Sequence, residues 1–358
     1  MKNCIKKIFV LLLPLGLLVS TGLRAQDMFY SQFNYAPLYL NPAFAGCAKN
    51  YLRMSGVAKI QWYNLYRPFR YVSAGADMSI YDGDMRNIVN LGATVDHSSK
   101  GYLNRTSVSG ILGRSFGIVD EDCAPWFLSI ALKAGFNIGR VNPDQFVFID
   151  QLDQTGFTGN PSQIDLFTTN NTRTYFDMSS GAIYCFKDLM FGISVMHLNE
   201  PNVSFVGKPE DGRLPRKYCG HVSWIYDRGD IRIKPTVIAQ FQGQSSMMTA
   251  GALFDFKQFP IELGLWYRNN TSLSYNNAIS LGFTWKWGQG RSQTSPQKEW
   301  SNSMGVSYDG EINKPGIRTT YGSMELGIQH NQPMGKDMIC PTSDRGKCRN
   351  YQFPWQFF

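Results

Sequence analysis

Residues 126–141 read WFLSIALKAGFNIGRV, and their side chains alternate between two kinds at nearly every step. Apolar residues occupy the even positions from 128 to 138, whereas Ser129, Lys133 and Asn137 lie among the positions between them. Successive side chains of a β-strand point to opposite faces, so this pattern predicts a strand with one apolar and one polar face. The stretch is longer than the roughly five or six residues of a usual strand. Such strands are typical of a barrel that crosses a membrane, with lipid outside and a polar lumen inside.

The same alternation returns along most of the chain, most clearly at 52–62, 72–80 and 279–287. We therefore predict an all-β fold, a transmembrane antiparallel β-barrel of about 14 strands, because an even number closes such a barrel with both chain ends on one side. The expected strands lie near 51–63, 69–81, 88–98, 103–116, 126–141, 173–186, 188–199, 215–227, 229–243, 245–256, 258–268, 273–287, 299–309 and 320–330.

The links between these strands predict which rim faces outward. Outer-membrane barrels have short periplasmic turns and longer outer loops. The two longest links, 142–172 and 200–214, follow the fifth and seventh strands, so both belong to the outer rim. Residues 288–298 form a polar link on the opposite, periplasmic rim and are the exception. The link 142–172 mixes apolar and polar residues, and either folds into the lumen or forms a mobile outer loop.

Composition agrees with a surface that does not face water alone. Apolar residues make up 43% of the chain and charged residues only 17%, below the roughly 25% of soluble domains. The formal charge is +8, but Lys2, Lys6, Lys7 and Arg24 lie in the N-terminal leader. The remaining positive charge is small and scattered, which argues against a nucleic-acid partner.

The N-terminus has the pattern of a signal peptide. Lysines at positions 2, 6 and 7 precede an apolar run at 8–19, and we expect cleavage after Ala25. The run is too short for a membrane helix, which needs about 20 apolar residues. We therefore predict a signal peptide at 1–25, an N-terminal periplasmic or plug segment at 26–50, a barrel at 51–330 and a periplasmic tail at 331–358.

Residues 31–46, SQFNYAPLYLNPAFAG, form the one aromatic stretch that fits neither helix nor central strand, because Pro37 and Pro42 interrupt it. The stretch resembles the start of the mature PorP/SprF family, outer-membrane proteins of the type IX secretion and gliding machinery. A Cys-Pro pair at 340–341, soon after the last expected strand, is similar to the end of that family. The residues that carry the resemblance are Asp27, Tyr30, Ser31, Gln32, Pro37, Tyr39, Asn41, Pro42, Ala43, Phe44, Ala45 and Gly46.

The resemblance implies a non-enzymatic barrel in the outer membrane. Its partners would be the periplasmic secretion ring or lipoproteins, the C-terminal domain of a large secreted adhesin, or both, besides outer-membrane lipid. We expect seven of these residues to hold the N-terminal segment against the barrel or a partner: Ser31, Gln32, Tyr39, Asn41, Pro42, Phe44 and Gly46. The alternative function is a channel for small or hydrophobic solutes, which a barrel of this size can form if its lumen is open.

Six cysteines follow the leader, and exported proteins allow disulfides. Cys340 and Cys348 could pair with each other, or either could pair with Cys47 if the chain ends meet, and the sequence leaves this open.

The search for reactive groups predicts no catalytic, metal or cofactor site. The four histidines, at 97, 197, 221 and 330, lie far apart and form no metal-ligand pattern. A serine hydrolase would need a base beside its nucleophile, and His221 with Ser223 is the one pair that shares a strand face. We therefore expect no enzyme.

Overall fold

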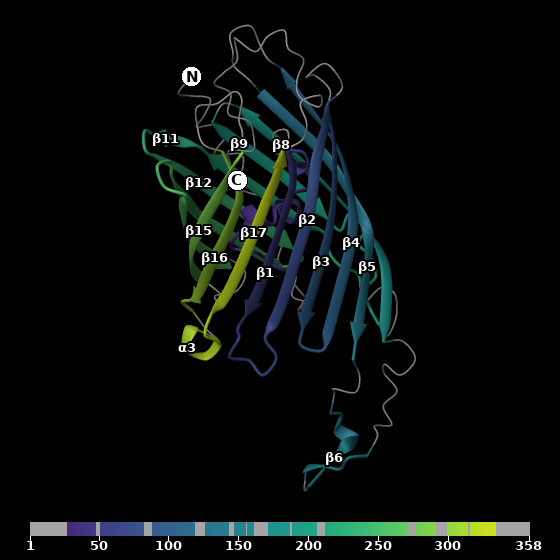
Figure 1. Ribbon diagram of the computed structural model, residues 1–358. Helices are drawn as coiled ribbons and strands as arrows, with labels where there is room; N and C mark the ends of the chain where they lie inside the picture. Colours follow the sequence, from purple (N-terminus) through teal and green to yellow (C-terminus); the bar gives the residue numbers. More distant parts are fainter. Residues whose placement is uncertain are drawn as a thin grey trace, which may run out of the picture.

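A computed structural model shows the fold of the chain (Figure 1). The structure describes residues 27–47, 51–81, 88–118, 126–142, 147–154, 156–160, 171–186, 188–205, 212–270, 277–290, 299–313 and 316–333. The predicted leader with its cleavage after Ala25, and most of the predicted tail with Cys340 and Cys348, lie outside these residues.

Fourteen antiparallel strands form a closed barrel, as the alternation predicted. Each strand pairs with its neighbours in chain order, the first strand also pairs with the last, and β10 pairs with β12. The strands are β1 (Tyr51–Gln61), β2 (Phe69–Tyr81), β3 (Ile88–Lys100), β4 (Leu103–Ile118), β5 (Trp126–Val141), β8 (Thr172–Phe186), β9 (Leu189–Met196), β10 (Lys217–Trp224), β12 (Ile231–Gln242), β13 (Ser245–Phe256), β14 (Ile261–Asn270), β15 (Ala278–Gly290), β16 (Glu299–Glu311) and β17 (Ser323–Pro333).

Small elements accompany the fourteen strands, and one of them pairs with β12 in the same sheet. The short strand β11 (Tyr226–Arg228) continues β10 after a break at Ile225, whose buried backbone N–H donates to the Asp188 carbonyl at 2.8 Å. This break separates what the sequence predicted as one strand at 215–227. The other elements are η5 (Ile149–Gln151), β6 (Leu152–Asp153), β7 (Gly156–Phe157) and α3 (Ile317–Thr320). In the described part of the chain, no helix is long and apolar enough to cross a membrane.

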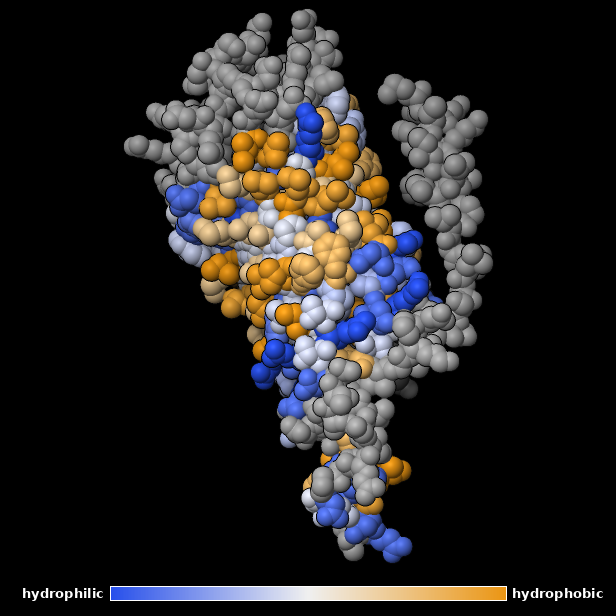
Figure 2. Space-filling model, turned by 90° about the vertical axis from the view of Figure 1, so that its right-hand side faces the viewer, coloured by the Kyte–Doolittle hydropathy of each residue, from blue (hydrophilic) through white to orange (hydrophobic). Residues whose placement is uncertain are grey.

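The two faces of each strand have opposite environments. In β5 the side chain of Ser129 is fully buried, whereas that of Leu132 is 54% exposed, the reverse of a soluble core. Hydrophobic residues gather on the outside of the wall in the upper and middle part of Figure 2, and hydrophilic residues gather below them. This is the arrangement of a lipid-facing surface around a polar interior.

The strand ends place the two longest links on the same rim, as the sequence predicts. β5 and β8 are joined on the rim that also carries α3, and β6 and β7 project from there, away from the lumen (Figure 1). The described part of the 142–172 link therefore does not fill the lumen. β15 ends at Gly290 and β16 begins at Glu299, and both of these strand ends lie on the rim opposite the one with the long links. We call the rim with the long links the outer rim.

Candidate functional site

Residues Asp27–Cys47 lie inside the barrel, and we call them the lumen segment. Its elements are η2 (Phe33–Tyr35), α2 (Pro37–Leu40) and η3 (Pro42–Phe44). Pro37 and Pro42 each take the first position of a turn, where a missing N–H costs nothing. The Asn41 side chain accepts a bond from the Ala43 backbone N–H at 2.9 Å and caps the last turn.

The lumen segment runs along the barrel from its outer half to its periplasmic half. Asp27 contacts Gln242, the last residue of β12, at the outer rim. At the other end, the Gly46 N–H donates to Asp77 at 2.8 Å, near the periplasmic end of β2. The sequence led us to expect this segment in the periplasm or the lower lumen. Its first residues lie nearer the outer rim, because their polar partners belong to the outer ends of the strands.

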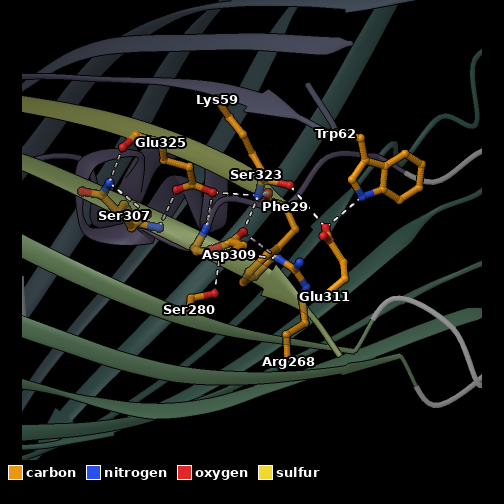
Figure 3. Close-up of polar contacts among 12 residues, drawn as sticks. Phe29, Lys59, Trp62, Arg268, Ser280, Ser307, Asp309, Glu311, Ser323 and Glu325 are labelled. Carbon is orange, nitrogen blue, oxygen red and sulfur yellow. Dashed lines mark hydrogen bonds and ion pairs between the residues drawn. The ribbon is translucent and has the colours of Figure 1, made fainter. Parts of the chain in front are cut away.

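Ser31 and Gln32 are held by a buried carboxylate. Their backbone N–H groups donate to the two side-chain oxygens of Glu325 at 2.8 and 2.7 Å. The Ser31 hydroxyl donates to Asp309 at 2.7 Å. Lys59 lies between the two acids, 2.7 Å from Glu325 and 3.1 Å from Asp309 (Figure 3). The backbone N–H groups of Ser31 and Gln32 have no backbone partner on a neighbouring strand, and the Glu325 carboxylate accepts both of them.

The charges in this cluster balance. Arg268 from β14 reaches Asp309 at 3.3 Å, so two cations face two carboxylates (Figure 3). All four side chains are at most 8% exposed. A buried charge is tolerated only when it is paired and hydrogen-bonded, and here the lumen segment supplies part of that bonding. We call Lys59, Arg268, Asp309 and Glu325 the charge cluster.

Tyr35 is a contact that the sequence reading missed. Its ring lies over Gly305 and Gly327, which are direct partners across β16 and β17, and a Cβ on either glycine would overlap it. The glycines themselves were the signal in the sequence, because a strand glycine leaves room for another group, here the Tyr35 ring, to approach the backbone closely. Tyr39, which was predicted, donates its hydroxyl to the Met28 carbonyl at 3.1 Å and packs edge-on against Tyr30.

Asn41 binds the opposite wall. Its amide nitrogen donates to the carbonyls of Ala182 at 3.2 Å and Ile193 at 3.1 Å, and lies 3.2 Å from the His221 ring nitrogen Nε2. The Phe44 ring stacks on the same histidine, with centroids 5.2 Å apart. These bonds give a buried side-chain amide partners on β8, β9 and β10.

Gly46 and Cys47 end the segment. Gly46 has φ = 70°, a left-handed conformation that favours glycine. Cys47 is a free, buried thiol that donates to the Ala43 carbonyl at 3.3 Å. The pairing of Cys340 and Cys348 lies outside the described residues.

The Asp27 end of the lumen segment meets a different group of charged residues, which lies at the outer rim. His197 lies between Asp27, at 2.6 Å, and Asp177, at 2.7 Å. A polar cavity of about 100 Å³ adjoins them, with Arg105 and Lys133 among its lining residues.

The contacts of His197 with Asp27 and Asp177 should make the stability of the barrel depend on pH. Burial lowers the pKa of His197, but Asp27 and Asp177 outweigh it and raise the pKa from 6.5 to about 9. Burial likewise raises the pKa of Asp27, and His197, Lys217 and Arg105 outweigh it, so the pKa lies below its usual range. Because folding raises the pKa of His197, its protonated form stabilises the fold. This stabilisation is complete below pH 6.5 and is lost as the pH rises through about 9.

We therefore expect the free energy of unfolding to fall by about 3 kcal/mol between these pH values. Denaturant unfolding in lipid vesicles would measure it, with His197→Asn as the control that should lack this slope. Equal slopes in both proteins would contradict the role of His197.

The arrangement offers no reactive centre in the described residues. His221 binds Asn41, whereas Ser223 shares a 2.8 Å hydrogen bond with Thr236, so these two residues of one strand face have different partners. Within the same residues, no group of three or more acidic, histidine or cysteine side chains could hold a metal ion.

Comparison with known proteins agrees with the architecture. The solved structures similar to this chain include the Ralstonia pickettii toluene transporter TbuX, at 8% identity and a TM-score of 0.51, covering 84% of this chain and 94% of that one. They also include the CymD monoaromatic hydrocarbon channel, at 10% identity and a TM-score of 0.49, covering 84% of this chain and 93% of that one. At such identities the likeness to TbuX shows the fold alone. A search of curated proteins found no match.

The sequence itself matches a family model described as type IX secretion system membrane protein PorP/SprF, over residues 23–329. That range includes the lumen segment and nearly all of the barrel. It confirms the resemblance read from residues 27–46. This outer-membrane β-barrel therefore belongs to the PorP/SprF family of type IX secretion system membrane proteins.

Proposed function

We propose that this protein is a non-enzymatic barrel that binds a protein partner of the type IX secretion system. The observation that supports this most is the occupied lumen. The lumen segment runs through it and bonds to β1, β2, β8, β9, β16 and β17. With the interior filled in this way, the rims of the barrel are the surfaces left for function.

The outer rim has the features of a binding surface. The described part of the 142–172 link carries exposed apolar side chains there, with Ile149 at 82% and Phe157 at 61% exposure. Exposed apolar groups beside polar ones are typical of protein contacts. We therefore favour a secreted or surface-anchored cargo, such as the C-terminal domain of an adhesin, over the periplasmic ring or lipoproteins.

A channel for small or hydrophobic solutes is the competing function. It requires a continuous path, whereas the lumen segment occupies the interior and bonds to strands on opposite walls. The structure therefore favours binding over conduction.

Purification from the native outer membrane tests the proposal. We expect an affinity-tagged copy of this chain to enrich a secreted surface protein at least about tenfold over an unrelated barrel of equal abundance, which corresponds to about 1.4 kcal/mol of preferential binding. The readout is quantitative mass spectrometry. A large, steady conductance of the purified protein in planar bilayers, together with no enriched secretion component or cargo, would contradict the proposal.

A further inference from the structure

The outer half of β8 has a strand on one side only. β8 pairs with β5 from Thr172 to Phe186, but β9 pairs only with Ser180–Phe186. The chain turns away after β9, where His197 adopts φ = 57°. Among the described residues, no strand lies beside Thr172–Ser179 on this second side.

The hydrogen bonds show which peptide groups face the open side. The Met178 carbonyl accepts from the Leu198 N–H at 2.8 Å, on the β9 side. The Asn171 carbonyl instead accepts from Val141 of β5 at 2.9 Å. Along a strand, the backbone N–H and C=O groups of successive residues point to alternate sides. The backbone groups of even-numbered residues of β8 therefore point to the open side. Thr172 and Thr174 therefore point there too.

One side chain takes the place of a neighbouring strand. Asn199 accepts a bond from the Met178 N–H at 3.1 Å and donates to the Phe176 carbonyl at 2.8 Å. A side-chain amide has the same donor and acceptor as a peptide group, so Asn199 does what one residue of a paired strand would do. Beyond it, no described residue bonds to the peptide groups of Thr174 and Thr172 on this side.

The open edge lies where the apolar outer surface of the barrel ends, toward the outer rim. The outward Phe176 ring packs against Phe136 of β5, at a centroid distance of 5.4 Å. The next outward residues toward the outer rim, Thr174 and Thr172, are polar and exposed. The edge is thus open at the boundary where a partner outside the cell could reach it.

The inner side of the same edge has polar atoms without partners. The Tyr175 hydroxyl and Asp177 Oδ1 are buried and have no hydrogen-bond partner among the described residues. Asp177 also lines the cavity at the outer rim. A strand beside β8 would direct alternate side chains toward these atoms.

We propose that the outer half of β8 accepts an extended segment of the secreted partner as an added strand. The segment bonds to the peptide groups of Thr172, Thr174 and Phe176 and replaces Asn199 there. Its inward side chains are hydrogen-bond donors that reach Asp177 and Tyr175. Main-chain bonds supply the affinity and the side chains supply the selectivity, as in other cases of strand addition to an open edge. This inference rests on the proposed function, because it names the part of the barrel that holds the cargo.

Photo-crosslinking in the native outer membrane tests it. A benzophenone amino acid at Thr174 should crosslink to one continuous segment of the enriched surface protein. The control position is Ile193, which is 67% exposed and lies in β9 between two paired strands. It should give no such product. Crosslinks from position 174 only to lipid or to this chain's own loops would overturn the proposal.

Three substitutions separate strand pairing from folding. Thr174→Pro removes the N–H that faces the open side, and should lower recovery of the partner about tenfold, whereas Thr174→Val keeps the N–H and should change it less than twofold. Asn199→Ala removes the competing amide and should raise the crosslink yield, which no loss of structure would do. If the wild type enriches the partner and none of these changes affects it, the strand site is wrong and the proposed function stands. If the wild type enriches no partner, both fail.

Discussion

Replacing Glu325 with alanine should destabilise the barrel by about 3–5 kcal/mol, the usual cost of removing one partner from a buried ion pair. Glu325 accepts the backbone N–H groups of Ser31 and Gln32 and lies 2.7 Å from Lys59. Without it, Lys59 keeps only Asp309 as a charged partner, and two buried donors of the lumen segment lose theirs. Denaturant unfolding of the protein in lipid vesicles would measure the change.

The matched control is an exposed glutamate. Glu200 lies 3.7 Å from Arg216, and its side chain is 35% exposed. Surface pairs contribute about 0–1 kcal/mol, so Glu200→Ala should leave stability nearly unchanged. A loss below about 1 kcal/mol in Glu325→Ala as well would show that the lumen segment does not depend on the charge cluster.

The substitution Gly181→Val should displace the lumen segment and open the barrel. A Cβ at Gly181 would overlap the Asn41 side-chain oxygen, and Asn41 is fully buried and cannot withdraw without losing its bonds to Ala182 and Ile193. Overpacking of this kind costs about 1–3 kcal/mol. We expect ion conductance in planar bilayers where the wild type shows little, and faster proteolysis of residues 27–47.

Gly110 provides the control for this substitution. It lies in β4, and an added Cβ there would meet no atom within 4 Å. Gly110→Val should therefore fold and conduct like the wild type. Equal conductance of the two variants would mean that contact with Asn41 does not keep the barrel closed.

The barrel could be predicted from the sequence because its signal is local. Alternation at 126–141 needs only neighbouring residues, and the even strand count follows from where the links fall. The path of the lumen segment could not be predicted in the same way. Ser31 and Glu325 are 294 residues apart, and only the strand register brings them together.

The site residues show the same limit. The motif pointed to Ser31, Gln32, Tyr39, Asn41, Pro42, Phe44 and Gly46, and the structure places all of them in the lumen segment. It did not point to their partners, such as Asp309 and Asp77, because a single charged residue in a strand looks the same whether it faces water or a buried donor. Tyr35 was missed because its contact depends on Gly305 and Gly327 being opposite each other.

The contacts of the lumen segment also set an order for folding. Residues 31 and 32 are made early, yet the carboxylate that they bind belongs to β17, the last strand. Contacts between distant parts of a chain form late, because a long loop must close first. Ser31 and Gln32 therefore cannot reach their final position until the last strand is in place, so a bound lumen segment indicates a completed barrel. Cells could use this as a check, because a truncated chain would keep its N-terminal segment free and open to proteases.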